Sequence, residues 1–259
     1  MDTIKLCKTV ETCTYVVVVF YEDEIISTGS GVSINKSGDL ITAAHVLAKL
    51  PVREEDLKDP KLTILARTKT GEYIEYKPGV TGPAIRLEYF REPLTIDLAI
   101  LKTPSPDNEV PFMPIGEEKV EVGTEVLMAG FPDEMELPFS FDKLLDFQHP
   151  EVRSKLKKLE PLRPQLMQKS GMVGHQNAIT MSDDSKDLEL FGDIFYVDNV
   201  MHSGSSGGPI INEEGIVIGI VTERAITSVP FEETPELRVP SGSAVAISPR
   251  IMLPFIEFT

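Results

Sequence analysis

The sequence predicts an all-β protein of two six-stranded antiparallel β-barrels, with a partly helical insertion and a short C-terminal helix. Short runs of apolar and β-branched residues recur along the chain, and glycine, proline and acidic turns separate them. Closed barrels suit such strands because closure leaves few sheet edges exposed. With 259 residues and 41% hydrophobic content, the chain can form one large or two modest hydrophobic cores.

The strand-like runs divide evenly between the two halves of the chain. In the first half they cover residues 16–20, 25–28, 31–34, 40–42, 62–66 and 98–101. In the second half they cover residues 125–129, 171–174, 194–197, 209–211, 216–221 and 243–247. Residues 107–114 are rich in proline and polar side chains and are typical of a linker, so we expect domains at 1–112 and 113–259.

Two segments interrupt the strand pattern. Residues 133–169 form an insertion, in which Pro150 marks a helix start and apolar side chains follow at helical spacing until Pro161. A helical subdomain there would serve as structural decoration, as a lid, or as a docking site for a regulatory protein. Residues 229–240, rich in proline and glutamate, predict a solvated, mobile loop, and residues 249–255 predict the terminal helix.

Charge and cysteine content exclude several classes of partner and compartment. A net charge of −16 excludes nucleic acid and anionic lipid as main partners, because either needs a basic face. Cys7 and Cys13 are the two cysteines, and both lie near the N-terminus. Residues 15–20 are apolar but too short to span a membrane, and no targeting signal is visible. We therefore expect a cytoplasmic protein with no membrane partner.

Three short segments carry residues that can perform nucleophilic catalysis. His45 ends the sequence Thr-Ala-Ala-His, Asp97 lies in Ile-Asp-Leu-Ala-Ile-Leu, and Ser206 lies in Gly-Ser-Ser-Gly-Gly-Pro. Together they supply a base, an orienting carboxylate and a nucleophile. Asp97 lies between apolar residues, which favours burial beside a histidine over exposure to solvent.

The serine segment is open to two other interpretations. It also fits the G-x-S-x-G nucleophile elbow of α/β-hydrolases, but in those enzymes the histidine follows the serine. The four histidines are His45, His149, His175 and His202, and all precede Ser206, which excludes that arrangement. A lone segment of this kind would more often be a glycine-rich turn between strands, and the His45 and Asp97 segments argue against that reading.

The chain resembles chymotrypsin-type serine proteases, and more closely the bacterial HtrA-like branch without a PDZ domain. The segments that resemble this family are residues 29–34, 38–46, 97–101, 122–126, 204–209, 215–220 and 244–247. The resemblance implies a serine endopeptidase that acts on protein or peptide substrates through His45, Asp97 and Ser206. It also implies an oxyanion hole made by the backbone N–H groups of Gly204 and Ser206. No metal site or cofactor is expected.

The same resemblance assigns the substrate-binding pocket. Its floor and wall are formed by Val200, Met201, His202, Val221, Thr222 and Glu223. No carboxylate lies at the floor, so we expect cleavage after small or medium apolar residues and not after Arg or Lys. Glu223 and His202 leave an acidic-residue preference as the alternative.

Activation differs from that of trypsin, because Ser205 stands where trypsin has an aspartate that pairs with a new N-terminus. Control by a partner or by loop ordering is therefore expected. The second function that stays open is a protease-fold interaction module with a poorly assembled triad.

Overall fold

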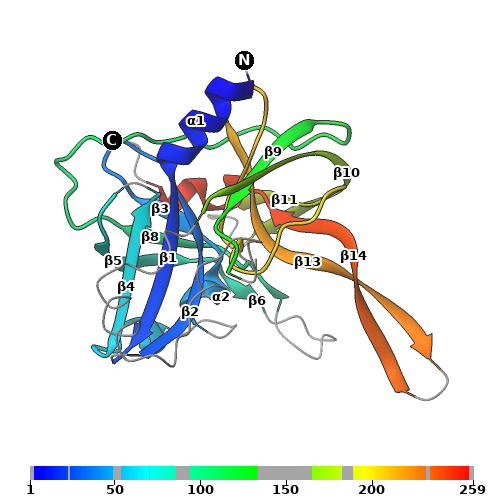
Figure 1. The fold of residues 1–259 in the computed structure, drawn as a ribbon, viewed down its shortest axis with the longest axis horizontal. Coiled ribbons are helices and arrows are strands. Elements are labelled where there is room, and N and C mark those ends of the chain that lie inside the picture. The colour runs from blue at the N-terminus through cyan, green and yellow to red at the C-terminus, as the bar shows by residue number, and fades with distance from the viewer. Residues whose placement is uncertain are drawn as a thin grey trace, which may run out of the picture.

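The computed structural model describes residues 3–22, 24–48, 54–69, 71–85, 94–133, 165–182, 189–231 and 234–256. Two six-stranded antiparallel sheets, each closed into a barrel, make up most of this part of the chain (Figure 1). The strands of the first barrel all precede those of the second in the sequence. The fold class expected for the barrels is therefore present.

The first barrel has the strand order β1-β2-β3-β8-β5-β4. Its strands are β1 (Thr14–Tyr21), β2 (Glu24–Ser33), β3 (Leu40–Thr42), β4 (Leu62–Thr68), β5 (Ile74–Thr81) and β8 (Ala99–Lys102). Between them lie the helices α2 (Ala44–Leu47) and α3 (Glu54–Leu57) and a small sheet of β6 (Ala84–Ile85) and β7 (Leu94–Thr95).

Two strand predictions in this barrel were wrong. Residues 25–28 and 31–34 were expected as separate strands, but β2 runs through both as one element. β5 was not predicted, because Pro78 and Gly79 in its middle are typical of a turn. The structure accommodates them with a register shift between Pro78 and Val80 against β8, where a proline needs no ladder hydrogen bond.

The second barrel has the strand order β10-β11-β14-β13-β12-β9, and β9 pairs with β10 to close it. Its strands are β9 (Glu125–Gly130), β10 (Met167–Ser182), β11 (Glu189–Val197), β12 (Pro209–Ile211), β13 (Val217–Phe231) and β14 (Thr234–Ile247). The 3₁₀ helix η1 (Pro249–Phe255) follows and forms the expected terminal helix.

β13 and β14 extend well beyond the second barrel as a two-stranded arm (Figure 1). The mobile loop expected over residues 229–240 is therefore wrong, because paired residues continue from Ile226 and Pro240 to Phe231 and Thr234. The predicted insertion at 133–169 also ends too late, because β10 begins at Met167. The helix expected within it lies outside the described residues.

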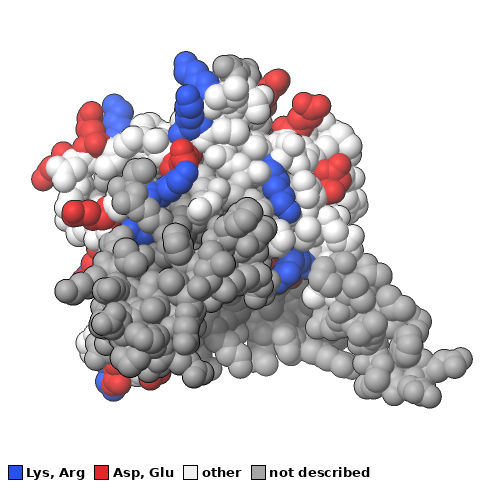
Figure 2. All heavy atoms as spheres, in the orientation of Figure 1, with Lys and Arg blue, Asp and Glu red and all other residues white. Residues whose placement is uncertain are grey.

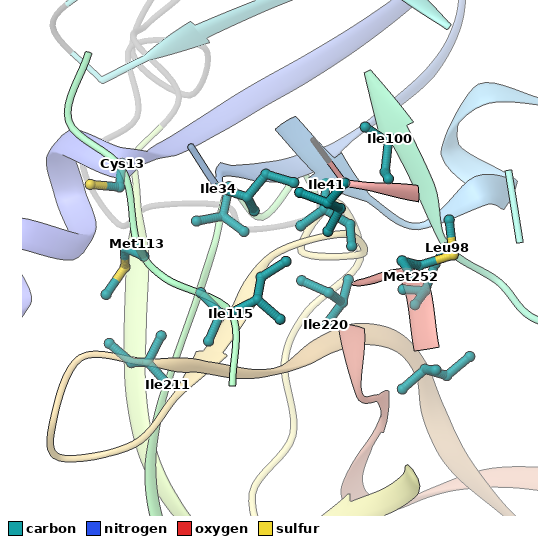
Figure 3. Packing of buried hydrophobic residues seen from close by; sticks show 14 of the residues in the cluster. Cys13, Ile34, Ile41, Leu98, Ile100, Met113, Ile115, Ile211, Ile220 and Met252 are labelled. Atoms are coloured by element: carbon teal, nitrogen blue, oxygen red, sulfur yellow. The ribbon is translucent and has the colours of Figure 1, made fainter. Parts of the chain in front are cut away.

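A hydrophobic cluster joins the two barrels (Figure 3). Ile34, Ile41 and Ile100 from the first barrel pack in one cluster with Ile211 and Ile220 from the second. The cluster also includes Met113 and Ile115 from the connecting segment, and Leu6, Val10 and Cys13 from the N-terminal helix α1 (Thr3–Cys13). The sequence analysis made no prediction for α1. Its buried residues recur at the spacing of one helix face and fix the helix against both barrels.

The described surface is mixed in charge. On the face seen in Figure 2, basic and acidic side chains are interspersed, and neither kind gathers into a continuous patch among the described residues. None of the described helices is long and apolar enough to cross a membrane.

Candidate active site

His45 lies in α2, directly after β3, and Asp97 lies between β7 and β8 of the same barrel. The Asp97 carboxylate makes two hydrogen bonds to His45. One oxygen accepts the backbone N–H over 2.8 Å, and the other lies 2.6 Å from the ring atom Nδ1. Ile96 and Leu98 are fully buried on either side of Asp97 and anchor its backbone in the core. The bidentate contact therefore fixes both the position and the ring orientation of His45.

The environment of His45 raises the pKa of its ring. Burial is the largest effect and by itself would lower the pKa, because it disfavours the charged imidazolium. The hydrogen bond and negative charge of Asp97, with a smaller contribution from the charge of Glu223, together outweigh burial and raise the pKa above 6.5. The ring is thus a stronger base than a free histidine.

Ser206 lies in a tight turn between β11 and β12 in the second barrel. The N–H of Ser205 donates to the carbonyl of His202 over 3.1 Å, which closes a four-residue turn with Gly204 at its third position. Gly204 has a φ of +81°, the value that a type II turn requires at this position and that glycine adopts without strain. Gly207 also has a positive φ of +85°. The expected glycine-rich loop is therefore a specific backbone conformation.

The Ser206 hydroxyl points toward the second barrel in this structure. Its Oγ donates to the carbonyl oxygen of Thr222 over 3.4 Å, which is long for a hydroxyl hydrogen bond. Within the described residues, no hydrogen bond joins this hydroxyl to the His45 ring. His45 and Asp97 are therefore in contact, whereas the Ser206 hydroxyl is bonded to the second barrel.

The backbone around Ser206 presents free N–H groups on one side. The carbonyl of Ser203 accepts the N–H of Asp133 over 3.0 Å, and the carbonyl of Ser205 accepts the N–H of Gly208 over 2.9 Å. A planar peptide directs its N–H opposite to its carbonyl, so these two bonds orient the N–H groups of Gly204 and Ser206. In the part of the chain that the structure describes, neither N–H has an acceptor. Two unpaired N–H groups in one turn are the kind of donors that an oxyanion hole requires.

Strand β2 supports this turn from the first barrel, which the sequence analysis did not foresee. Ser30 donates its N–H to the carbonyl of Ser206 over 2.7 Å and its hydroxyl to the carbonyl of Gly204 over 2.9 Å. Thr28 donates its hydroxyl to the carboxylate of Asp133 over 2.9 Å. The sequence Gly-Ser-Gly at residues 29–31 belongs to the segments that resemble the protease family, but by itself it does not indicate a contact with the serine turn.

The predicted pocket residues separate into two groups. Met201 and Val221 are buried in the hydrophobic core of the second barrel, and Thr222 is buried with its carbonyl against Ser206. Val200 and His202 are half-buried, and Glu223 is exposed. The sequence predicts one pocket from these six residues, but Met201, Val221 and Thr222 are buried and only the other three face outward at least in part.

Lys169 is a further residue at this site that the sequence analysis missed. From β10, its ammonium donates to the carbonyl of Val200 over 2.8 Å and lies 3.5 Å from Nε2 of His202. It lay at the end of the predicted insertion, where nothing in the local pattern connects it with residues 200–202.

A family model described as the trypsin-like peptidase domain matches residues 29–220. The match covers well over half of the chain and includes His45, Asp97 and Ser206. It also includes Ser30 on β2.

Curated relatives and solved structures agree with this match. Over 225 residues the chain is 24% identical to proteins named "Serine protease HtrA-like" from Staphylococcus aureus strains RF122 and USA300, which is 85% of this chain. The chain spans 22% of the length of these relatives. It is also similar to the crystal structure of the Rv3671c protease from M. tuberculosis in its active form. That likeness has a TM-score of 0.59 and 14% identity, and it covers 96% of this chain and 81% of the other. The inactive form gives a TM-score of 0.54 at 15% identity, over 96% and 89% of the two chains.

Proposed function

Because the chain belongs to the family of trypsin-like peptidases, we propose that it is a serine endopeptidase that cleaves peptide bonds through Ser206, His45 and Asp97. The observation that carries this proposal is the bidentate contact of the buried Asp97 with His45, together with the two free N–H groups in the turn that holds Ser206. A base held in one orientation and a nucleophile beside two free N–H groups are the parts that acyl transfer needs.

The proposed reaction begins when the Ser206 hydroxyl rotates from the Thr222 carbonyl toward Nε2 of His45. The ring takes the hydroxyl proton as Oγ attacks the carbonyl carbon of the scissile bond, and Asp97 stabilises the imidazolium that forms. The imidazolium then gives this proton to the leaving amine, and the carbon–nitrogen bond breaks to leave an acyl-enzyme. Water attacks the acyl-enzyme with His45 again as base, and this step releases the acid and restores Ser206.

The N–H groups of Gly204 and Ser206 would stabilise the oxyanion of each tetrahedral intermediate. Losing one such donor typically costs about 2.7–4 kcal/mol of transition-state stabilisation. The anchored carbonyls of Ser203 and Ser205 support this role, because they hold both donors in place before substrate arrives.

We also propose that the enzyme prefers small or medium apolar residues before the cleaved bond. Val200 and the buried Met201 place no carboxylate at the pocket floor, which supports this preference over Arg or Lys. Cleavage profiling with a peptide library would test it. Enrichment of Asp or Glu at this position would instead indicate that Lys169 and His202 select the substrate.

Control by the insertion is a further part of the proposal. Asp133, where the insertion begins, donates its N–H to Ser203 and so orients one of the oxyanion donors. A partner that moves this segment would therefore change activity. We expect deletion of residues 138–166, joined by a short glycine linker, to change peptide turnover several-fold in a variant whose thermal melt shows that it is folded.

Labelling with a fluorophosphonate probe tests the main proposal, because only an activated serine reacts. We expect the wild-type protein to be labelled, Ser206→Ala and His45→Ala to remain unlabelled, and Ser205→Ala to be labelled normally. The direction of the Ser206 hydroxyl toward Thr222 favours the second candidate function, an interaction module with an unassembled triad. Absence of labelling in the folded wild-type protein would favour that module.

A further inference from the structure

Among the described side chains of the first barrel, Ser30 is the one that donates a hydrogen bond to the Ser206 turn. It is fully buried, and its hydroxyl donates to the carbonyl of Gly204 over 2.9 Å while it accepts the N–H of Phe131 over 2.8 Å. One hydroxyl therefore joins β2, the end of β9 and the turn before the nucleophile.

The peptide unit that Ser30 holds lies between the two units that carry the proposed oxyanion donors. Its carbonyl, from Gly204, accepts the Ser30 hydroxyl, and its N–H, from Ser205, donates to His202. A planar unit fixed at both ends cannot rotate, so the adjoining N–H groups of Gly204 and Ser206 keep a common direction. Without the hydroxyl, the contact with His202 would be the one hydrogen bond left on this peptide unit among the described residues.

We propose that Ser30 is a positioning residue for the oxyanion hole and that its hydroxyl, not its backbone alone, keeps the Gly204 N–H directed at the substrate. This inference rests on the proposed function. The backbone N–H of Ser30 anchors Ser206 whatever side chain is present, so the hydroxyl can be tested separately.

Ser33 offers a matched control on the same strand. It is also fully buried, but among the described residues its hydroxyl has no hydrogen-bond partner. Ser30→Ala and Ser33→Ala remove the same atom from β2, and only the first removes contacts with the turn. Ser30→Cys keeps a donor at the same position, although the thiol is larger and donates more weakly.

The activity test is the rate of fluorophosphonate labelling, separated into probe binding and the maximal labelling rate. We expect Ser30→Ala to lower the maximal rate about 10- to 100-fold, because complete loss of an oxyanion donor costs about 10²- to 10³-fold in kcat. Probe binding and the midpoint of the acidic limb of the pH profile should not change, because His45 is untouched. Ser33→Ala should match the wild-type protein, and Ser30→Cys should be intermediate.

A second readout does not depend on activity. Amide hydrogen–deuterium exchange of residues 203–208 should become faster in Ser30→Ala and stay unchanged in Ser33→Ala. A folded Ser30→Ala protein with wild-type exchange in this turn would overturn the inference, and so would a wild-type maximal labelling rate. Equal losses in both alanine variants would also overturn it, because they would indicate general destabilisation of β2. If the wild-type protein is not labelled, the proposed function fails, and the exchange measurement still decides the role of Ser30.

Discussion

The His45–Asp97 pair is held within one barrel, whereas the turn that carries Ser206 is held by contacts from both. A single carboxylate between two buried residues supplies both bonds to His45. The turn depends on Ser30 from the first barrel and on Asp133, Gly208 and the Val221 carbonyl from the second. The position of the base is thus fixed within the first barrel, whereas the position of the nucleophile depends on how the two barrels dock.

The largest loss of activity should come from breaking the His45–Asp97 pair of the first barrel. Asp97→Asn keeps the shape of the side chain but favours the wrong tautomer of His45, so we expect kcat to fall about 10⁴-fold. Asp39→Asn is the control, because Asp39 is another buried carboxylate of this barrel and binds Lys102 and the N–H of Thr103. It should lower the melting temperature without loss of turnover. An active Asp97→Asn protein would contradict the assignment of the orienting acid.

The contact between barrels can be broken at Gly207. A Cβ there would lie 2.0 Å from the Ser30 carbonyl oxygen and 2.2 Å from Oγ1 of Thr42, at a φ of +85°. We expect Gly207→Ala to abolish labelling and to lower the free energy of unfolding by about 3 kcal/mol or more. Gly123→Ala has a similar φ of +93° with nothing within 4 Å of the new atom, so it isolates backbone strain of about 1–2 kcal/mol. Chemical denaturation of both variants measures the difference, and equal losses would show that the barrel contact contributes nothing.

A smaller effect is expected at Ser205, next to the nucleophile. Its side chain is fully buried, and its hydroxyl has no partner among the described residues. Ser205→Ala removes a desolvated polar group, so we expect activity to remain and stability to stay equal or rise by about 1 kcal/mol. Thermal melts and labelling rates of the variant provide the check. Loss of activity here with retention in Ser206→Ala would identify Ser205 as the nucleophile.

The smallest effect concerns the charge of Glu223. The neutral form of His45 is the base, so activity should fall as the pH drops through its pKa, which lies above 6.5. The negative charge of Glu223 raises this pKa, so Glu223→Gln should lower it and extend activity to lower pH. The pH profile of peptide hydrolysis measures the shift, with Glu24→Gln on β2 as the control. A midpoint that moves upward in Glu223→Gln would have the wrong sign.

Sequence patterns located the strands where hydrophobic periodicity was uninterrupted. Five of the six runs of the second half lie within strands of the second barrel, and the sixth, residues 216–221, begins one residue before β13. β5 and the outer part of the β13–β14 arm were misread because proline and glycine usually mark turns. Pro78 sits at a register shift, and Pro240 lies in a two-stranded ribbon. The backbone nitrogen of proline carries no hydrogen, so a proline fits a strand only where this nitrogen faces no acceptor on a neighbouring strand. Local composition does not show which way the nitrogen faces.

The candidate site was predictable only in its most distinctive residues. His45, Asp97 and Ser206 lie in short segments whose order and neighbours indicate their chemistry, and the structure brings His45 and Asp97 into contact. The role of the three residues stays a prediction until it is tested. Ser30 and Lys169 act through contacts with residues 174 and 31 positions away. No local pattern encodes such contacts, because they depend on how the strands are arranged in space.

The bond between Ser30 and Gly204 spans most of the length of the polypeptide, and synthesis proceeds from the N-terminus. The first barrel therefore leaves the ribosome with its histidine and aspartate long before the serine is made. When the serine does emerge, its turn is still unsupported until the second barrel closes and docks against β2. On the proposed function, a nascent or half-folded chain has no working nucleophile and cannot digest its neighbours. Proteolytic activity would appear only as the last consequence of complete folding.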